Sequence, residues 1–350
     1  MESLPGGFDS GYLNEILSRS GVLGAARVRG LAIQDARNTL LSRIVRLRPD
    51  YEGDAGEAPR SLILKTILPA GQRLDWNAGR QEVDFYAKVA PHTPAGLLPR
   101  CFDAVASQDG SSWHLLLEDL APTHFIVTTW PLPPGRDEAA RILQARARFH
   151  ATGWDHAALG HSVGKWVTPA EVQDFLAKFA QKYARLVDRT GDLLSPARRS
   201  LYERLMDATP HLMARYESHR NMTLVHGDGH FWNCFLANDG TGVKFFDWDC
   251  WRIDVATDDL AYMIAMHWYP ERRARFERSL LDRYHETLVA HGVEGYDRHA
   301  LDEDYRLSVL WQLATPVWQA DIDLPPPIWW NNLERIMMAV DDLGCRELLA

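Results

Sequence analysis

The first third of the chain consists of short apolar runs separated by polar turns, which is the pattern of β-strands. These runs cover residues 26–34, 42–48, 61–68 and 113–120. Two further stretches, residues 12–17 and 80–88, carry apolar residues at helical spacing instead. The pattern therefore predicts a small sheet accompanied by one or two helices.

From residue 137 onward, apolar positions recur mostly with the helical period. Thr168-Pro-Ala-Glu171 has the composition of a capping box with proline in the first turn, so it predicts the start of a helix. Asp137 is the expected cap of the preceding helix, and Pro210 is expected to interrupt a later one. The predicted helices cover residues 137–152, 168–187, 196–218, 258 onward, 271–291, 303–314 and 331–348.

The change from strands to helices predicts an α+β fold with two lobes. A dense proline stretch at residues 130–135 marks the crossing into the second lobe. We expect a small antiparallel-sheet N-lobe at residues 1–120 and a larger, mostly helical C-lobe at residues 121–350.

The composition, with 46% hydrophobic and 24% charged residues, is that of an ordinary globular protein. No apolar run approaches the ~20 residues of a membrane span, and the N-terminus lacks the basic start and apolar core of a signal peptide. The net charge of −9 argues against a nucleic-acid partner, and Arg146 and Arg148 are expected on a solvated helix face. Because the four cysteines are scattered, we expect reduced thiols and a cytoplasmic protein.

The polar residues that say most about chemistry lie between residues 226 and 247. Asp228 and Asn233 share one loop, which is followed by two apolar runs joined by the turn at residues 238–242. This arrangement predicts a β-hairpin that carries Asp247 back beside the loop. The Asp228 carboxylate could then orient a hydroxyl, while the Asn233 amide oxygen and the Asp247 carboxylate suit Mg²⁺.

The stretch His226-Gly-Asp-x-His-x-x-Asn233, followed by Phe-Asp-Trp at residues 246–248, resembles the aminoglycoside phosphotransferase family. That family shares its catalytic loop with choline kinases. The resemblance implies a protein-kinase-like fold with ATP between the lobes, and transfer of the γ-phosphate to a hydroxyl of a small molecule. It makes Asp228 the catalytic residue and gives Mg²⁺ to Asn233 and Asp247.

The resemblance also implies nucleotide contacts in the N-lobe. Lys65 stands alone in an apolar strand, where an ammonium is costly to bury without a partner, so we expect it to contact the nucleotide phosphates. Its expected ion-pair partner is Glu82, with Asp84 as the alternative. Adenine is expected to bond to backbone groups near Glu118 to Leu120.

The loop expected to cover the phosphates is at residues 35–41 and contains no glycine. No Walker-type phosphate loop occurs anywhere in the chain. Asn38 and Thr39 are therefore the candidate donors to the phosphates.

Three other functions fit parts of the pattern. His226 and His230 flank Asp228 as they could in a metal hydrolase, but no second histidine cluster follows at a useful spacing. A protein kinase is disfavoured because no Asp-Phe-Gly or Ala-Pro-Glu element follows Asn233. A non-catalytic kinase-like binding module is disfavoured because the lysine and all three polar catalytic positions are present.

The phosphate acceptor is the least defined part of the prediction. Asp249 follows the predicted metal site closely in sequence, and Asp321 and Asp323 lie among C-terminal tryptophans. Carboxylates and tryptophan rings both attract cations. They favour an acceptor with an amine or quaternary nitrogen, either an aminoglycoside-like antibiotic or a choline or ethanolamine-type metabolite. Structural roles for the same acids and tryptophans remain the alternative, and the sequence carries no signal for an oligomeric state.

Overall fold

The computed structural model describes residues 4, 8–68 and 78–350. Residue contacts divide the chain into two compact units. The first comprises Met1–Ile126 and Cys234–Trp251, and the second comprises Val127–Asn233 and Arg252–Ala350. The lobes expected at residues 1–120 and 121–350 stay a prediction. The compact units differ from them chiefly because the segment 234–251 makes its contacts with the first unit.

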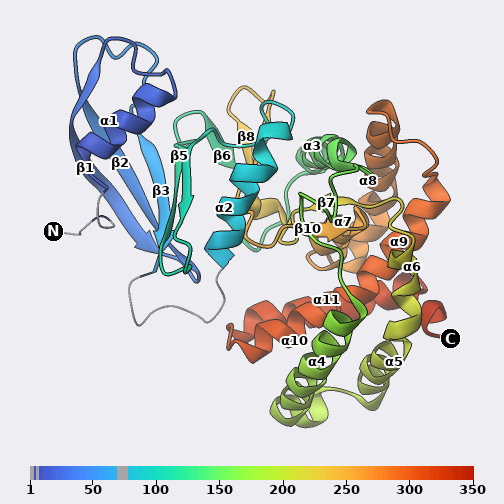
Figure 1. The fold of residues 1–350 in the computed structure, drawn as a ribbon. Coiled ribbons are helices and arrows are strands. Elements are labelled where there is room, and N and C mark those ends of the chain that lie inside the picture. The colour runs from blue at the N-terminus through green and yellow to red at the C-terminus, as the bar shows by residue number, and fades with distance from the viewer. Residues whose placement is uncertain (1–3, 5–7, 69–77) are drawn as a thin grey trace. The chain divides into compact units, whose positions relative to one another are not determined.

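The first unit is built on a five-stranded antiparallel sheet with strand order β1-β2-β3-β5-β4 (Figure 1). Helix α1, Ser10–Arg19, lies against this sheet because Leu13, Ile16 and Leu17 form one apolar face that packs on Leu47 and its neighbours. Helix α2, Ala78–Lys88, contacts β4 and β5. The strands are β1 Arg27–Asn38, β2 Ser42–Glu52, β3 Leu62–Ile67, β4 Cys101–Ala106 and β5 Trp113–Glu118.

Two sequence predictions about this sheet need correction. The loop expected at residues 35–41 is shorter, because β1 continues through Asn38 and pairs with β2 up to Arg43. Only residues 39–41 remain as a turn, in which the Thr39 N–H donates to the Ser42 carbonyl at 2.7 Å. The edge strand β4 was missed because its residues are nearly all half-buried and do not alternate.

A second, three-stranded sheet with order β6-β8-β9 completes the first unit. Its strands are β6 His124–Ile126, β8 Cys234–Ala237 and β9 Val243–Phe245. The hairpin predicted from the apolar runs and their turn is therefore confirmed, with Cys234 opposite Phe245. The strand β9 ends two residues before Asp247.

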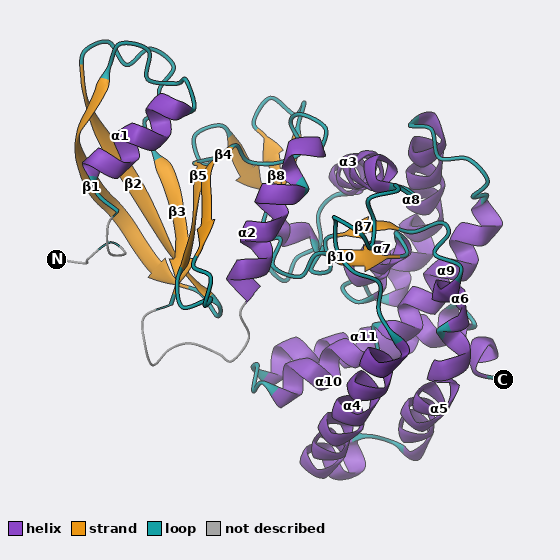
Figure 2. Ribbon diagram, in the orientation of Figure 1, coloured by secondary structure: helices purple, strands orange, loops and turns teal. Residues whose placement is uncertain are grey.

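The second unit is mainly helical, as Figure 2 shows by colour. Its two short strands, β7 Thr223–Val225 and β10 Arg252–Asp254, pair antiparallel, and in sequence they flank the segment that contains Asp228, Asn233 and Asp247. None of the helices in the described part of the chain has the length and apolarity needed to cross a membrane. The helices are α3 Arg136–Gly153, α4 Pro169–Thr190, α5 Pro196–Leu212, α6 Ala214–Glu217, α7 Thr257–Leu260, α8 Pro270–Ala290, α9 Arg298–Trp311, α10 Ala314–Asp321 and α11 Pro326–Asp342.

The structure shows where the predicted helix caps and the predicted helix break lie. The capping box at Thr168 is confirmed, with reciprocal hydrogen bonds between Thr168 and Glu171 at 3.3 and 2.9 Å. Asp137 was wrongly predicted as a cap: Gly135 occupies that position, and Asp137 lies in the first turn beside Arg136. Pro210 lies within α5 and does not interrupt it at that point.

Candidate active site

Lys65 is the centre of a buried ion cluster in the first unit. It lies on β3 between Ile44 of β2 and Leu115 of β5. Its Nζ is 2.5 Å from the Glu82 carboxylate and also contacts Asp247. Burial alone would lower the pKa of the lysine, but these carboxylates outweigh it and raise that pKa above its ordinary value. Lys65 therefore stays a cation in a protected site.

The open choice between Glu82 and Asp84 as the partner of Lys65 is decided by the direction of each side chain on α2. Glu82 is 1% exposed and faces Lys65. Asp84 is half-exposed, and its carboxylate lies 3.3 Å from the Lys88 ammonium, one turn further along the same helix. The pair is thus Lys65–Glu82, whereas its role toward a nucleotide stays a prediction.

The segment after β9 contacts α2 through a stacked pair of aromatic rings and through hydrogen bonds. The Trp248 N–H donates to Glu82 at 3.2 Å, and the Trp248 ring stacks on Phe85 with centroids 4.0 Å apart. Further along, the Trp251 indole donates to the Gln81 carbonyl at 2.8 Å. Asp247 itself adopts a left-handed backbone conformation with φ of 69°. Such a conformation costs free energy for a non-glycine residue and persists where the surroundings enforce it, often at functional sites.

A cavity of about 300 Å³ opens beside this cluster within the first unit. Lys65, Glu82 and Asp247 line it, together with Glu118 and Leu120. Thr39 also lines it, whereas Asn38, the other candidate phosphate donor, ends β1 and is not among the lining residues. The volume lies at the lower end of the roughly 300–1,000 Å³ typical of ligand pockets.

Two of the backbone groups expected to receive adenine are already engaged. The Glu118 N–H donates to the Arg100 carbonyl at 2.8 Å, and the Leu120 carbonyl accepts from Thr123 and His124. The Glu118 carboxylate is 2.6 Å from Lys244. Both residues line the cavity, but these contacts restrict which of their atoms could bind a base.

The loop with Asp228 and Asn233 belongs to the second unit and is held by hydrogen bonds of its own. The Asn233 side-chain amide donates to the Asp228 carbonyl at 2.9 Å and to its carboxylate at 3.1 Å. Since the nitrogen of Asn233 is used in this way, its amide oxygen is the atom suited to a cation. The Asp228 side chain keeps 29% of its surface exposed, so it can reach a substrate.

Beneath this loop, the buried carboxylate of Asp259 holds the backbone in place. It accepts from the N–H groups of His226 and Gly227, both at 2.9 Å. Arg146 and His150 of α3 each contact the same carboxylate at 3.1 Å. Burial works against the ionised form, but the charge of Arg146 and the hydrogen bond from His150 outweigh it and lower the pKa of Asp259.

The network around Asp259 was not predicted from the sequence. Arg146 was expected on a solvated helix face, yet it is fully buried, where Asp259 balances its charge and accepts from Nη1 while the Gly229 carbonyl accepts from Nη2. The sequence placed Asp259 among the acids that could attract a cationic acceptor, with a helix cap as the alternative, and neither interpretation predicts this network. Glycine at position 229 is needed as well, because a Cβ there would lie 2.8 Å from the Asp259 carboxylate.

We expect Asp259→Asn to destabilise the protein by about 3–5 kcal/mol at pH 7, because the substitution leaves the Arg146 cation buried without its counter-charge. The folded-state pKa of Asp259 lies below its unfolded value of about 3.9. Its ionisation therefore stabilises the fold above that pH, and this contribution is lost as the pH falls. Urea unfolding at pH 7 and below pH 4 measures both effects; a constant difference between variant and wild type across this range would contradict the assignment.

Each of the three acids predicted to contact the acceptor has charged neighbours within its own unit. Asp249 is buried in the first unit, where its charge helps to raise the pKa of Lys65. Asp321 lies 2.6 Å from Arg185, and Asp323 lies 3.1 Å from Arg189. Because these two carboxylates are paired with arginines, the structure gives no support to a cation site at Asp321 or Asp323.

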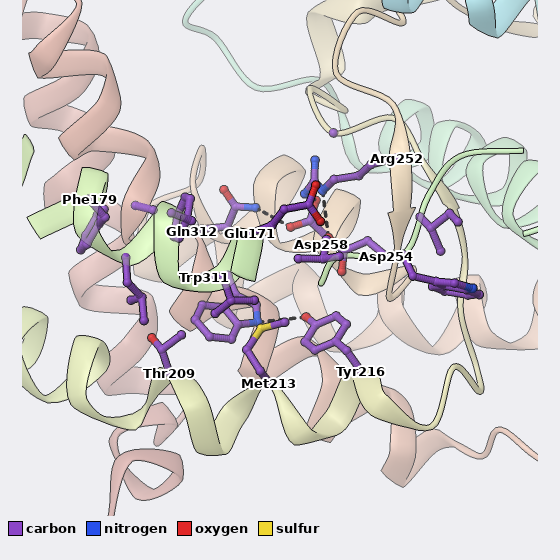
Figure 3. A pocket seen from close by; sticks show the side chains of 18 of the residues that line it. Glu171, Phe179, Thr209, Met213, Tyr216, Arg252, Asp254, Asp258, Trp311 and Gln312 are labelled. Atoms are coloured by element: carbon purple, nitrogen blue, oxygen red, sulfur yellow. Dashed lines mark hydrogen bonds and ion pairs between the residues drawn. The ribbon is translucent and has the colours of Figure 1, made fainter. Parts of the chain in front are cut away.

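A second cavity, of about 480 Å³, lies within the second unit (Figure 3). Residues of α4, α5, α9, α10 and β10 line it, and so does Gly227 of the loop that carries Asp228. Sequence reasoning missed this cavity, since its residues are scattered from Trp166 to Thr315. The described residues contain no group of three or more His, Cys, Asp or Glu side chains arranged to hold a metal ion, so a zinc-hydrolase site finds no support.

Comparisons with known proteins identify the fold. The model of the ecdysteroid kinase-like family matches residues 37–293. A choline kinase of Cryptosporidium parvum is 9% identical, with 91% of each chain covered and a TM-score of 0.63. A proposed aminoglycoside phosphotransferase of Ralstonia eutropha is 12% identical, with 96% of this chain and 98% of the other covered and a TM-score of 0.59.

A choline/ethanolamine kinase family protein of Mesorhizobium loti is likewise 12% identical, with 95% and 98% of the two chains covered and a TM-score of 0.53. No curated protein sequence matches the chain. At these identities the structures establish the fold alone. The expected α+β, protein-kinase-like fold of small-molecule phosphotransferases is therefore confirmed.

Proposed function

The chain belongs to the ecdysteroid kinase-like family of small-molecule phosphotransferases, and we propose that it transfers the γ-phosphate of ATP to a hydroxyl group of a small molecule. The observation that carries this proposal is the buried Lys65 ammonium, held by Glu82 and Asp247 in a cavity of the first unit. A fixed cation in a protected cavity is what phosphate oxygens require.

In this proposal, the second unit supplies the carboxylate that acts on the acceptor hydroxyl. Asp228 accepts the proton of the acceptor hydroxyl, or aligns that hydroxyl, as its oxygen forms a bond to the γ-phosphorus. The bond from that phosphorus to the bridging oxygen breaks, and ADP leaves with the electron pair. Asn233 keeps the Asp228 carboxylate in position through its 3.1 Å hydrogen bond. Phosphoryl transfer depends chiefly on such positioning and on charge neutralisation.

The residues proposed for Mg²⁺ fit that ion by their chemistry. Asn233 offers an amide oxygen and Asp247 a carboxylate, and Mg²⁺ prefers oxygen ligands with few carboxylates and several phosphate or water oxygens. Chain connectivity supports the pairing, because Asn233 is bonded to Cys234, which lies opposite Phe245, two residues before Asp247. When bound, the ion would neutralise charge on the phosphates.

The acceptor is proposed to be an alcohol with an apolar body. The family is named for steroid substrates, and the second unit contains a cavity with a largely apolar lining that includes Phe179, Met213 and Trp311. The amine-bearing acceptor favoured by the sequence, of the aminoglycoside or choline type, remains the alternative. An ATP-consumption screen that includes steroid alcohols, aminoglycosides, choline and ethanolamine distinguishes the two.

Nucleotide binding can be tested apart from the acceptor. We expect ATP with Mg²⁺ to raise the melting temperature, since a ligand at about 100 times its Kd stabilises a protein by about 2.7 kcal/mol. Differential scanning fluorimetry with ATP, with ATP and Mg²⁺, and with neither measures this shift. Absence of any nucleotide-dependent stabilisation would favour a scaffold that has lost its catalytic function.

We expect chelation of divalent metal by EDTA to abolish activity, and excess Mg²⁺ to restore it. Asp247→Ala should remain inactive at any Mg²⁺ concentration, because it removes the carboxylate assigned to the ion. Asp239→Ala is a matched control, since Asp239 is exposed on the turn between β8 and β9 of the same unit. Full activity of wild type in EDTA would contradict the mechanism.

A further inference from the structure

Another cavity, of about 450 Å³, lies within the first unit beside the segment that joins α2 to β4, and we call it the α2–β4 cavity. Its walls include Tyr86 of α2, Glu118 of β5, Lys244 of β9 and residues of the segment 90–100. The volume falls within the roughly 300–1,000 Å³ typical of ligand pockets. None of the described residues that act in the proposed mechanism lines it, so the proposed reaction does not account for this cavity.

The wall of the α2–β4 cavity is held in place by the protein itself. The segment between α2 and β4 is hydrogen-bonded to β9, where the Phe245 N–H donates to the Leu97 carbonyl at 2.8 Å. It is also bonded to β5, where the Glu118 N–H donates to the Arg100 carbonyl at 2.8 Å. Three prolines of this segment line the cavity, and each proline ring fixes its own φ. A wall that is already ordered loses little conformational freedom when a ligand binds.

Tyr86 brings an unused hydrogen-bond donor to this wall. The residue is only 5% exposed, and its hydroxyl has no hydrogen-bond partner within the part of the chain that the structure describes. A buried hydroxyl without a partner costs free energy. An acceptor atom of a ligand in the α2–β4 cavity would remove that cost.

The charged side chains that line the α2–β4 cavity carry one net positive charge. Lys244 and Glu118 form an ion pair at 2.6 Å, so their charges cancel. The Arg100 guanidinium donates to the Ser20 carbonyl at 3.0 Å, and no carboxylate among the described residues forms an ion pair with it. An ammonium has three N–H donors, and Glu118 accepts from one of those on Lys244. The lining therefore offers an anion both donors and an uncompensated charge.

The α2–β4 cavity shares part of its wall with the cavity that contains Lys65. Pro99 and Glu118 line both cavities. Tyr86 lies one helical turn after Glu82, whose carboxylate is 2.5 Å from the Lys65 ammonium. An anion beside Glu118 adds negative charge to the wall of the cavity proposed for the ATP phosphates, and like charges repel.

We propose that the α2–β4 cavity is a regulatory site for a small molecule with an anionic oxygen group, a carboxylate or a phosphate, on a short apolar body. Arg100 and Lys244 bind the anionic group, Tyr86 donates to one of its oxygens, and the prolines of the wall contact the body. The bound anion weakens nucleotide binding in the adjoining cavity. Binding of the anion is independent of the proposed function, whereas its effect on the nucleotide rests on that function.

Binding of the anion is tested without ATP, by ligand-detected NMR titrations with benzoate, phenyl phosphate and benzamide. These probes share one ring and differ in charge. For wild type we expect each anion to bind at least about tenfold more tightly than neutral benzamide, the effect of a hydrogen bond to a charged group. The tighter of the two anions shows whether the site selects a carboxylate or a phosphate. Equal Kd values for all three probes would overturn the proposal.

Variants of the wall locate the bound anion. Arg100→Gln should raise the Kd of the tighter anion about tenfold by removing the uncompensated charge. Tyr86→Phe should raise it about three- to tenfold through the loss of one hydrogen bond. Urea unfolding should show Tyr86→Phe to be at least as stable as wild type, because its hydroxyl has no partner among the described residues. Arg48→Gln is the matched control, since Arg48 is exposed on β2 and lines neither cavity. Anion binding that is unchanged in both Arg100→Gln and Tyr86→Phe would contradict the assignment of the cavity.

The effect on the nucleotide is measured by calorimetric titration of Mg²⁺ with a non-hydrolysable ATP analogue at rising concentrations of the tighter anion. We expect the Kd of the analogue to rise about fivefold and then level off, because the coupling between two separate sites is finite. At the same anion concentrations, Arg100→Gln should lose most of this rise. A Kd that continued to rise in proportion to the anion would show competition for a single site and overturn the proposal.

The two measurements separate this inference from the proposed function. If the analogue does not bind, the proposed function fails, while the NMR titrations still judge the α2–β4 cavity. If the analogue binds with the same Kd at every anion concentration, the regulatory effect is wrong and the phosphotransferase stands.

Discussion

Asp228→Asn is expected to lower kcat by about 10²–10⁴-fold, the usual contribution of a positioned general base. The new side chain has nearly the same shape and retains an oxygen that can accept the hydrogen bond from Asn233. It cannot take up the proton of an attacking hydroxyl. Turnover should therefore collapse while the fold and nucleotide binding persist. Steady-state kinetics with the best acceptor of the screen, together with fluorimetry in Mg²⁺-ATP, measures both properties.

The control for Asp228→Asn is Asp192→Asn. Asp192 is exposed on the turn Gly191–Leu193 of the same unit and does not line the cavity. We expect this variant to behave as wild type in both measurements. If Asp228→Asn kept more than about half of wild-type activity, a general base that contributes orders of magnitude could not be this residue.

Lys65→Met is expected to lower kcat/KM for ATP by about 10²–10³-fold, the effect typical of removing a fixed group that stabilises developing charge. The substitution also leaves the buried Glu82 without its counter-ion, which should destabilise the fold by about 3–5 kcal/mol. Kinetics with varied ATP and urea unfolding measure the two effects. Lys88→Met is the control, because Lys88 is exposed on α2 and pairs with Asp84.

A double variant separates the two roles of Lys65. Burial disfavours the ionised form of Glu82 and raises its pKa. The double variant Lys65→Met/Glu82→Gln therefore replaces an acid that has lost its counter-ion by a neutral side chain of the same shape. We expect it to recover much of the lost stability without recovering ATP turnover. Activity that returned together with stability would show that Lys65 serves the fold alone.

The parts of the candidate site that could be predicted from sequence are those encoded in short stretches. The hairpin from Cys234 to Phe245 follows from two apolar runs and a turn. An ammonium in an apolar strand needs a partner, so the sequence predicts an ion pair for Lys65, and the structure contains its pair with Glu82. These features depend on neighbours within one or two elements of structure.

The parts that could not be predicted depend on residues that are far apart in sequence. Arg146 and Asp259 meet across more than one hundred positions, so nothing near either residue distinguishes it from a surface charge or a helix cap. The same holds for Asp321 and Asp323, whose arginine partners lie on α4. The apolar cavity is likewise lined by residues scattered from Trp166 to Thr315, and each of the elements that carry them looks like ordinary core when taken alone.

The central claim is that this chain moves a phosphoryl group from ATP to an alcohol. Its most direct test is mass spectrometry of a panel of neutral steroid alcohols, aminoglycosides and choline after incubation with the protein, ATP and Mg²⁺. We predict an acceptor that gains one phosphoryl group with wild type, and gains none with Asp228→Asn or in EDTA. A phosphorylated product formed equally well by Asp228→Asn, or ATP hydrolysed with water as the only acceptor across the panel, would contradict the account.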